Sequence, residues 1–266
     1  MTDPGDFGWL AGLPAWARGA AGAQLGFLGV VLVFSWLSSA LGVGGYALLP
    51  LFVWHYGAKS GVAVITVYFL FQNLSKVALL WRHIDFGFAA RLVAWAVPGA
   101  VLGGALLVAL PARHLQRMLG AGMLALLLLP RLLPHLLPRR PAPSPRLRRL
   151  GVAGFALAYG VASGVLGSGN ALKGPLLTSM GVLKERYVGT YALTSLALNV
   201  PKLAVYHQGG VASAGLLAAC WPLLLVSLAG TYLGKRALRH IPESWFEKVT
   251  TAVFVVSALS MLVFPQ

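Results

Sequence analysis

Three lysines lie inside the apolar runs of this chain and are its best candidates for chemistry. They are Lys76, Lys173 and Lys202, and the six acidic residues lie in the N-terminal segment or near loops. An ionisable group within a membrane-length apolar run is costly, so its presence indicates a function. Cations without carboxylates beside them predict that a mobile anion provides the opposite charge.

An asparagine stands three residues before two of these lysines, Asn73 before Lys76 and Asn199 before Lys202. Residues i and i+3 share a helix face, so each pair presents an amide donor beside an ammonium group. Such a pair is suited to binding an oxyanion. The alternative is that these two lysines, about five residues from their expected helix ends, extend to the membrane interface. For Lys173, which lies near a turn, the alternative is that it only reaches a polar cavity.

A glycine-rich stretch occurs twice, as Leu-Gly-Val-Gly-Gly-Tyr-Ala-Leu-Leu-Pro at 41–50 and as Leu-Gly-Ser-Gly-Asn-Ala-Leu-Lys-Gly-Pro at 166–175. Leu, Gly, Gly and Pro recur at identical spacing, about 125 residues apart. A helix beginning within each stretch would direct unpaired N–H groups and a positive dipole end at the bilayer middle, which favours anion binding. The alternative is close helix packing through small residues. The residues expected to contact an anion here are Gly42, Gly44, Gly45, Gly167, Ser168, Gly169 and Asn170.

Other small and hydroxyl residues have more ordinary interpretations. Two glycine pairs at four-residue spacing indicate close helix packing rather than ligand binding. Serine and threonine in such helices usually bind carbonyl groups of their own helix, although they can also line a cavity. The glycine pairs are Gly99 with Gly103 and Gly230 with Gly234, and the hydroxyl residues are Thr66, Ser75, Thr194 and Ser195.

Composition predicts the elements that must position these residues. The chain is 58% hydrophobic and 10% charged, which is typical of a membrane protein with several spans. Its N-terminus carries Asp3 and Asp6 before any basic residue, which argues against a cleaved signal peptide. The apolar runs are at about 22–41, 46–56, 61–81, 87–110 and 114–133, then at about 150–166, 170–182, 187–206, 211–234 and 244–264.

A segment rich in proline and arginine divides the chain into two halves. Residues 134–149 are expected to form a cytoplasmic linker between an N-terminal membrane repeat, 1–133, and a C-terminal one, 150–266. We predict an all-α fold of two inverted four-helix repeats, each beginning with a broken hairpin helix. That gives about eight spans and two short half-helices. This arrangement places most basic loops inside, although Arg113 and Arg117 would face outside.

The motifs together resemble the TauE/SafE family of sulfite exporters. The resemblance rests on the two glycine-rich stretches, on Asn-x-x-Lys in both halves and on the Gly-x-x-x-Gly helices, and it extends from about Leu25 to Val263. It implies export of sulfite, or of an organosulfonate such as sulfoacetate, across the bacterial inner membrane. The second half departs from the family pattern at Ser168, Asn170 and Lys173. These residues favour a different or larger anion than sulfite.

Several other classes of function are not favoured. The net charge of +15 lies mostly between spans, where topology and lipid headgroups explain it better than nucleic acid does. Enzyme motifs and paired carboxylates are missing, and with one cysteine, Cys220, no intramolecular disulfide or cysteine-based metal site is possible. We therefore expect no cofactor, no metal and no catalysis.

The sequence leaves some choices open within the membrane-protein class. The partners are a small anion and membrane lipids, and the protein is a monomer or a homodimer. Alternating access around a midplane site is the leading hypothesis. A passive anion channel, a membrane scaffold and an importer remain alternatives, and the driving force is not determined.

Overall fold

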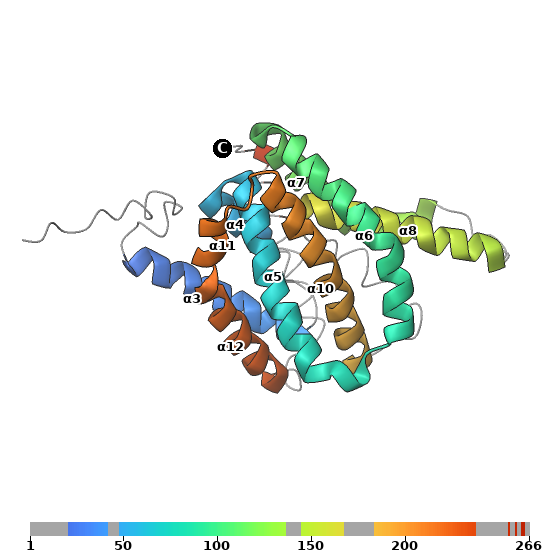
Figure 1. Ribbon diagram of the computed structural model, residues 1–266, viewed down its shortest axis with the longest axis horizontal. Helices are drawn as coiled ribbons and strands as arrows, with labels where there is room; N and C mark the ends of the chain where they lie inside the picture. Colours follow the sequence, from blue (N-terminus) through green and yellow to red (C-terminus); the bar gives the residue numbers. More distant parts are fainter. Residues whose placement is uncertain are drawn as a thin grey trace, which may run out of the picture.

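The computed structural model describes residues 21–41, 48–136, 145–167 and 184–237, together with positions 255, 259, 262 and 263. Within these residues the regular structure is helical, and no strand occurs (Figure 1). The helices are α3 (Ala21–Leu41), α4 (Leu48–Tyr56), α5 (Ala58–Leu80), the 3₁₀ helix η2 (Trp81–His83), α6 (Phe86–Ala109), α7 (Ala112–Leu136), α8 (Pro145–Leu166), α10 (Lys184–Gln208), α11 (Ala214–Ala219) and α12 (Trp221–Ala237).

Several of these helices are long and apolar enough to cross a membrane. By length and composition the clearest spans are Ala58–His83, Phe86–Ala109 and Ala214–Gly234, with shorter apolar segments in α3 and α8. A span needs roughly 20 apolar residues. Helix α10 is 25 residues long but carries many polar side chains along its length. The protein is a multi-pass membrane protein, and the expected total of about eight spans stays a prediction.

Helices α5 and α10 form an antiparallel pair at the centre of the bundle (Figure 1). At one end Gly189 of α10 lies against Leu80 of α5, where an added Cβ would be 3.3 Å from the Leu80 carbonyl oxygen. At the other end the hydroxyl group of Tyr206 contacts that of Thr66. Because both helices are largely buried, their polar residues face other helices rather than lipid.

Glycines allow two further helix pairs to come into backbone contact. A Cβ added at Gly99 or Gly103 of α6 would collide with backbone oxygens of α8, and one added at Gly160 would collide with the carbonyl of Ala96. In the same way, a Cβ at Gly230 of α12 would collide with Ser35 of α3. These glycines serve close packing, as expected for Gly99, Gly103 and Gly230.

The short helix α4 returns toward the N-terminal part of α3. The ring of Phe27 in α3 stacks on His55 at 4.3 Å and meets Phe52 edge to face at 5.4 Å. Pro50 is the third residue of α4, and a proline in the first turn costs no helical hydrogen bond. Gly57, with φ of 81°, then joins α4 directly to α5.

The run expected at 211–234 forms two helices rather than one. Helix α11 ends at Ala219, and α12 begins at Trp221 after a turn at Cys220. Pro222 explains the break, because proline lacks an N–H group and suits the first turn of a new helix. Both ends of the expected linker at 134–149 are helical, since α7 extends to Leu136 and α8 begins at Pro145.

Candidate functional site

Lys76 belongs to a row of polar residues on one face of α5. Its Nζ donates to Oε1 of Gln72 at 3.1 Å, and Nε2 of Gln72 donates to the Tyr68 hydroxyl at 2.9 Å. The three residues are spaced by four, so they stand above one another on the helix. Lys76 is only 5% exposed. Its ammonium group therefore binds inside the protein and does not extend to the membrane interface.

The row on α5 continues onto two neighbouring helices. Nε2 of Gln72 also lies 3.5 Å from Oγ of Ser39 in α3, and Ser39 donates to Oγ1 of Thr231 in α12 at 3.3 Å. Sequence reasoning missed Gln72, Ser39 and Thr231. Only Gln72 had a usable signal, because it stands four residues before Lys76 and so shares its helix face.

Lys202 is held by a different set of atoms. It is fully buried, and its Nζ donates to Oγ of Ser163 at 3.0 Å, to the Ser163 carbonyl at 3.3 Å and to the Gly167 carbonyl at 3.0 Å. All three acceptors belong to the C-terminal end of α8. An ammonium group has three N–H donors, so this set matches it completely.

Gly167 marks the point where the second glycine-rich stretch leaves α8. Its φ is 70°, the left-handed conformation in which a glycine commonly ends a helix. A Cβ at this position would also lie 3.1 Å from Ile65 and 3.4 Å from Oγ1 of Thr66, both in α5. Helix α8 therefore ends where the second glycine-rich stretch begins, and the Gly167 carbonyl accepts a hydrogen bond from Lys202.

The two asparagines lie near the middle of the central helix pair. Asn73 lies midway along α5 between Thr66 and Leu80, two residues that contact α10, and Asn199 has a similar place on α10 between Gly189 and Tyr206. Asn199 is 2% exposed, and its Nδ2 has no hydrogen-bond partner among the described residues. A buried amide without a partner is costly and calls for an explanation. A bound ligand would provide one.

The described residues include some of the predicted anion contacts. The structure places Asn73, Lys76, Gly167, Asn199 and Lys202 on α5, at the end of α8 and on α10, as described above. The predicted contacts outside the described residues are Gly42, Gly44, Gly45, Ser168, Gly169, Asn170 and Lys173. For these seven the assignment to an anion site stays a prediction.

The hydroxyl residues of the central helices bind their own backbone. Thr66 donates to the Val62 carbonyl at 2.7 Å, and Ser75 donates to the Phe71 carbonyl at 2.9 Å. The Thr194 hydroxyl donates to the Thr190 carbonyl at 3.0 Å. Of the two interpretations that the sequence allowed, the local one therefore holds for these three.

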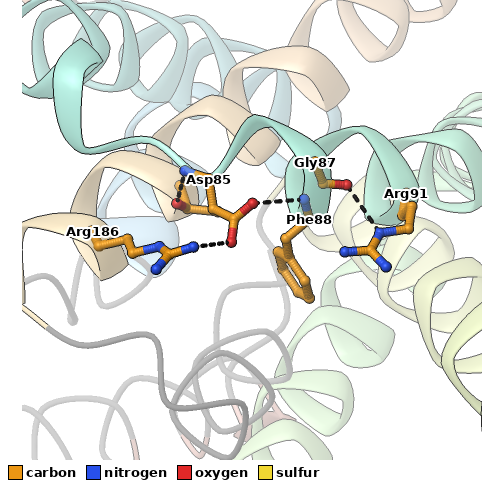
Figure 2. A network of polar contacts seen from close by, with 6 residues as sticks. Asp85, Gly87, Phe88, Arg91 and Arg186 are labelled. Carbon is orange, nitrogen blue, oxygen red and sulfur yellow. Dashed lines mark hydrogen bonds and ion pairs between the residues drawn. The ribbon is translucent and has the colours of Figure 1, made fainter.

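A cluster of charged residues lies at one end of the bundle, where α6 and α10 begin (Figure 2). Oδ1 of Asp85 accepts from the Phe88 backbone N–H at 2.9 Å, and Oδ2 accepts from Nη2 of Arg186 at 2.6 Å. The Asp85 backbone N–H donates to Oγ1 of Thr190 at 2.9 Å. The Phe88 N–H, and then Arg186, hold the pKa of the Asp85 carboxyl below its ordinary value. The cluster joins the two helices outside the apolar spans.

Comparison with known proteins gives the class of this molecule. No group of three or more potential metal ligands occurs among the described residues. The searches of curated proteins and of solved structures gave no match. The model of the family described as Sulfite exporter TauE/SafE matches residues 6–261, which is nearly the whole chain. The resemblance drawn from the motifs is thereby confirmed, and the chain belongs to the TauE/SafE sulfite exporter family.

Proposed function

We propose that this protein exports a small sulfur-containing oxyanion, sulfite or an organosulfonate such as sulfoacetate, across the bacterial inner membrane. The observation that carries the proposal is the buried ammonium group of Lys76, whose acceptor among the described residues is the neutral Gln72. The described acids, Asp85 and Glu185, lie at the end of the bundle near Arg186. A membrane-embedded cation without a carboxylate is suited to a passing anion.

The anion site proposed here lies between α5, α10 and the two glycine-rich stretches. Asn73 and Asn199 would donate from the two central helices at one depth. Helix α4 begins within the first stretch, at Leu48, and Leu48 and Leu49 are buried, so its N-terminal N–H groups would point into the protein interior. Ser168, Asn170 and Lys173 of the second stretch would then distinguish a larger organosulfonate from sulfite.

The pairing of helices supports an inverted repeat. In the predicted repeat, α3, α5 and α6 of the first half correspond to α8, α10 and α12 of the second. Helix α6 packs on α8 and α12 packs on α3, while α10 packs on α6 and α12 packs on α5. If each helix is replaced by its counterpart in the other half, the α6–α8 contact becomes the α12–α3 contact, and the α6–α10 contact becomes the α12–α5 contact. The α5–α10 pair is converted into itself. Such symmetry is typical of transporters that work by alternating access.

The orientation proposed from basic residues agrees with this packing. Asp85 and Arg186 meet at one end of the bundle, so the loops before α6 and α10 lie on the same side of the membrane. At the opposite end Nζ of Lys59 donates to the Val108 carbonyl, and Gly209 lies against Val108. The end with Arg82 and Arg186 is the cytoplasmic side in our proposal.

The test combines anion binding with transport by purified protein. Sulfite, sulfate, thiosulfate, sulfoacetate, taurine and simple carboxylates are compared for anion-dependent thermal stabilisation, and the best ligand is then assayed in proteoliposomes. Lys76→Ala should abolish transport while the protein still inserts, because a charged hydrogen bond to the anion is lost. Undiminished transport by this variant would refute the site. Ohmic currents without exchange across the bilayer would show a channel, and net uptake from the opposite side would show an importer.

A further inference from the structure

Lys76 and Lys202 occupy equivalent sequence positions, yet their ammonium groups are bound differently. Lys202 donates to three oxygen atoms of α8, from Ser163 and Gly167. Lys76 donates to one oxygen atom, Oε1 of Gln72 in its own helix. Since each ammonium group has three donors, the described residues satisfy Lys202 fully and leave two donors of Lys76 without an acceptor.

A difference in the repeated sequence explains this asymmetry. Four residues before Lys76 stands Gln72, whereas four residues before Lys202 stands Leu198, which is buried. Leu198 has no acceptor, so Lys202 has no side-chain partner one turn away on its own helix. It reaches α8 instead.

The acceptors of Lys202 occupy its N–H donors and stabilise its positive charge. They are carbonyl and hydroxyl oxygens in the last turn of α8 and at Gly167, which ends that helix. The last carbonyls of a helix lack intrahelical partners, and a cation there is stabilised by the negative end of the helix dipole. A lysine bound in this way is a weak ligand for an anion. Its effect is to fix the backbone at Gly167, where the second glycine-rich stretch begins.

We propose that the two lysines have separate tasks in the transport site, and this inference rests on the proposed function. Lys76 is the cation that contacts the transported anion. Lys202 is a positioning residue that holds the end of α8 through Ser163 and Gly167.

The surroundings of Lys76 fit its task. Its side chain reaches back along α5 to Gln72, the residue that precedes Asn73. Nδ2 of Asn199, which has no hydrogen-bond partner among the described residues, offers another donor. An arriving oxyanion could therefore accept from the two donors of Lys76 that the described residues leave without an acceptor, while Gln72 remains held by Tyr68.

The experiment uses two anions of different charge as probes of the intact protein. They are sulfite at alkaline pH, a dianion, and methanesulfonate, a monoanion. For each variant, the two dissociation constants and the melting temperature without anion are measured. Losing a contacting cation costs the dianion more than the monoanion, because Coulomb energy scales with charge. A purely structural defect changes both affinities alike.

The expected results separate the two lysines. Lys76→Met should weaken sulfite binding by about tenfold or more and collapse the preference for the dianion, with little change in melting temperature. Lys202→Met should lower the melting temperature by about 5 °C and weaken both anions in equal proportion. Lys202→Arg should restore binding, because it supplies donors to the same carbonyls. Ser163→Ala, which removes no charge, should resemble a milder Lys202→Met.

Two outcomes would overturn the inference, and they can be told apart. If Lys202→Met removes the dianion preference while Lys76→Met keeps it, the assignment of tasks is wrong but the exporter proposal stands. If the wild-type protein binds neither probe, the proposed function itself fails. Should Lys202→Met not fold, Ser163→Ala provides the same comparison, and a weakened sulfite affinity relative to methanesulfonate would count against positioning.

Discussion

Positively charged side chains have different partners at the end of the bundle near Asp85 and in the interior around Lys76. At the end, Arg186 is 61% exposed and forms an ion pair with a carboxylate. In the interior, Lys76 and Lys202 bind neutral oxygens of glutamine, serine and backbone. A fixed carboxylate in the interior would occupy the lysine permanently and compete with the anion. Among the described residues, the acids Asp85 and Glu185 lie only at the end of the bundle, where they would not compete with an anion at the proposed site.

The strongest way to break this contrast is to put a carboxylate beside Lys76. Gln72→Glu would form an internal ion pair with Lys76, and it should reduce anion transport in proteoliposomes by about a hundredfold. The matched control is Gln72→Leu, which copies Leu198 of the other half. This control should retain transport, because it adds no competing charge. Normal transport by Gln72→Glu would show that Lys76 does not meet the anion.

A smaller effect should follow from replacing the unpartnered amide. Asn199→Leu removes a donor to the anion and should weaken anion binding by about tenfold. The same change removes a buried polar group that has no partner among the described residues, so the melting temperature without anion should rise or stay unchanged. Both quantities come from one thermal-shift titration. A fall in melting temperature with unchanged affinity would assign Asn199 a structural role instead.

The smallest effect is expected at the exposed ion pair. Asp85→Asn keeps the helix cap for Phe88 but removes the charge, so it should cost at most about 1 kcal/mol and leave transport unchanged. Because the folded-state pKa of Asp85 is lowered, its ionised form contributes stability above about pH 4 and loses it as pH falls through the folded pKa. The variant should differ from wild type in a pH series at neutral pH and converge with it in acid. Asp85→Ala, which also removes the cap, should be less stable at every pH.

The sequence predicts the central helices well because their apolar runs are long. Helix α5 and α6 begin and end close to the expected runs, and Lys76 and Lys202 are buried as the charge distribution indicated. The hydrogen-bond partners of the lysines were not predicted from the sequence. Ser163 is 39 residues from Lys202, and no local pattern connects them before the helices pack. The break at Cys220 was missed because an apolar run conceals a turn, although Pro222 marked it.

The glycine contacts between helices bear on how the protein can move. Helices α6 and α8 meet backbone to backbone at Gly99, Gly103 and Gly160, and α12 meets α3 where Gly230 lies against Ser35. Helices packed this closely leave little room for side chains between them to slide or adapt. Each pair should therefore move as one rigid unit, although its two helices come from opposite halves of the chain. If the protein works by alternating access, as proposed, the hinges should lie between these two units and the α5–α10 pair, and the moving parts would not coincide with the repeated parts of the sequence.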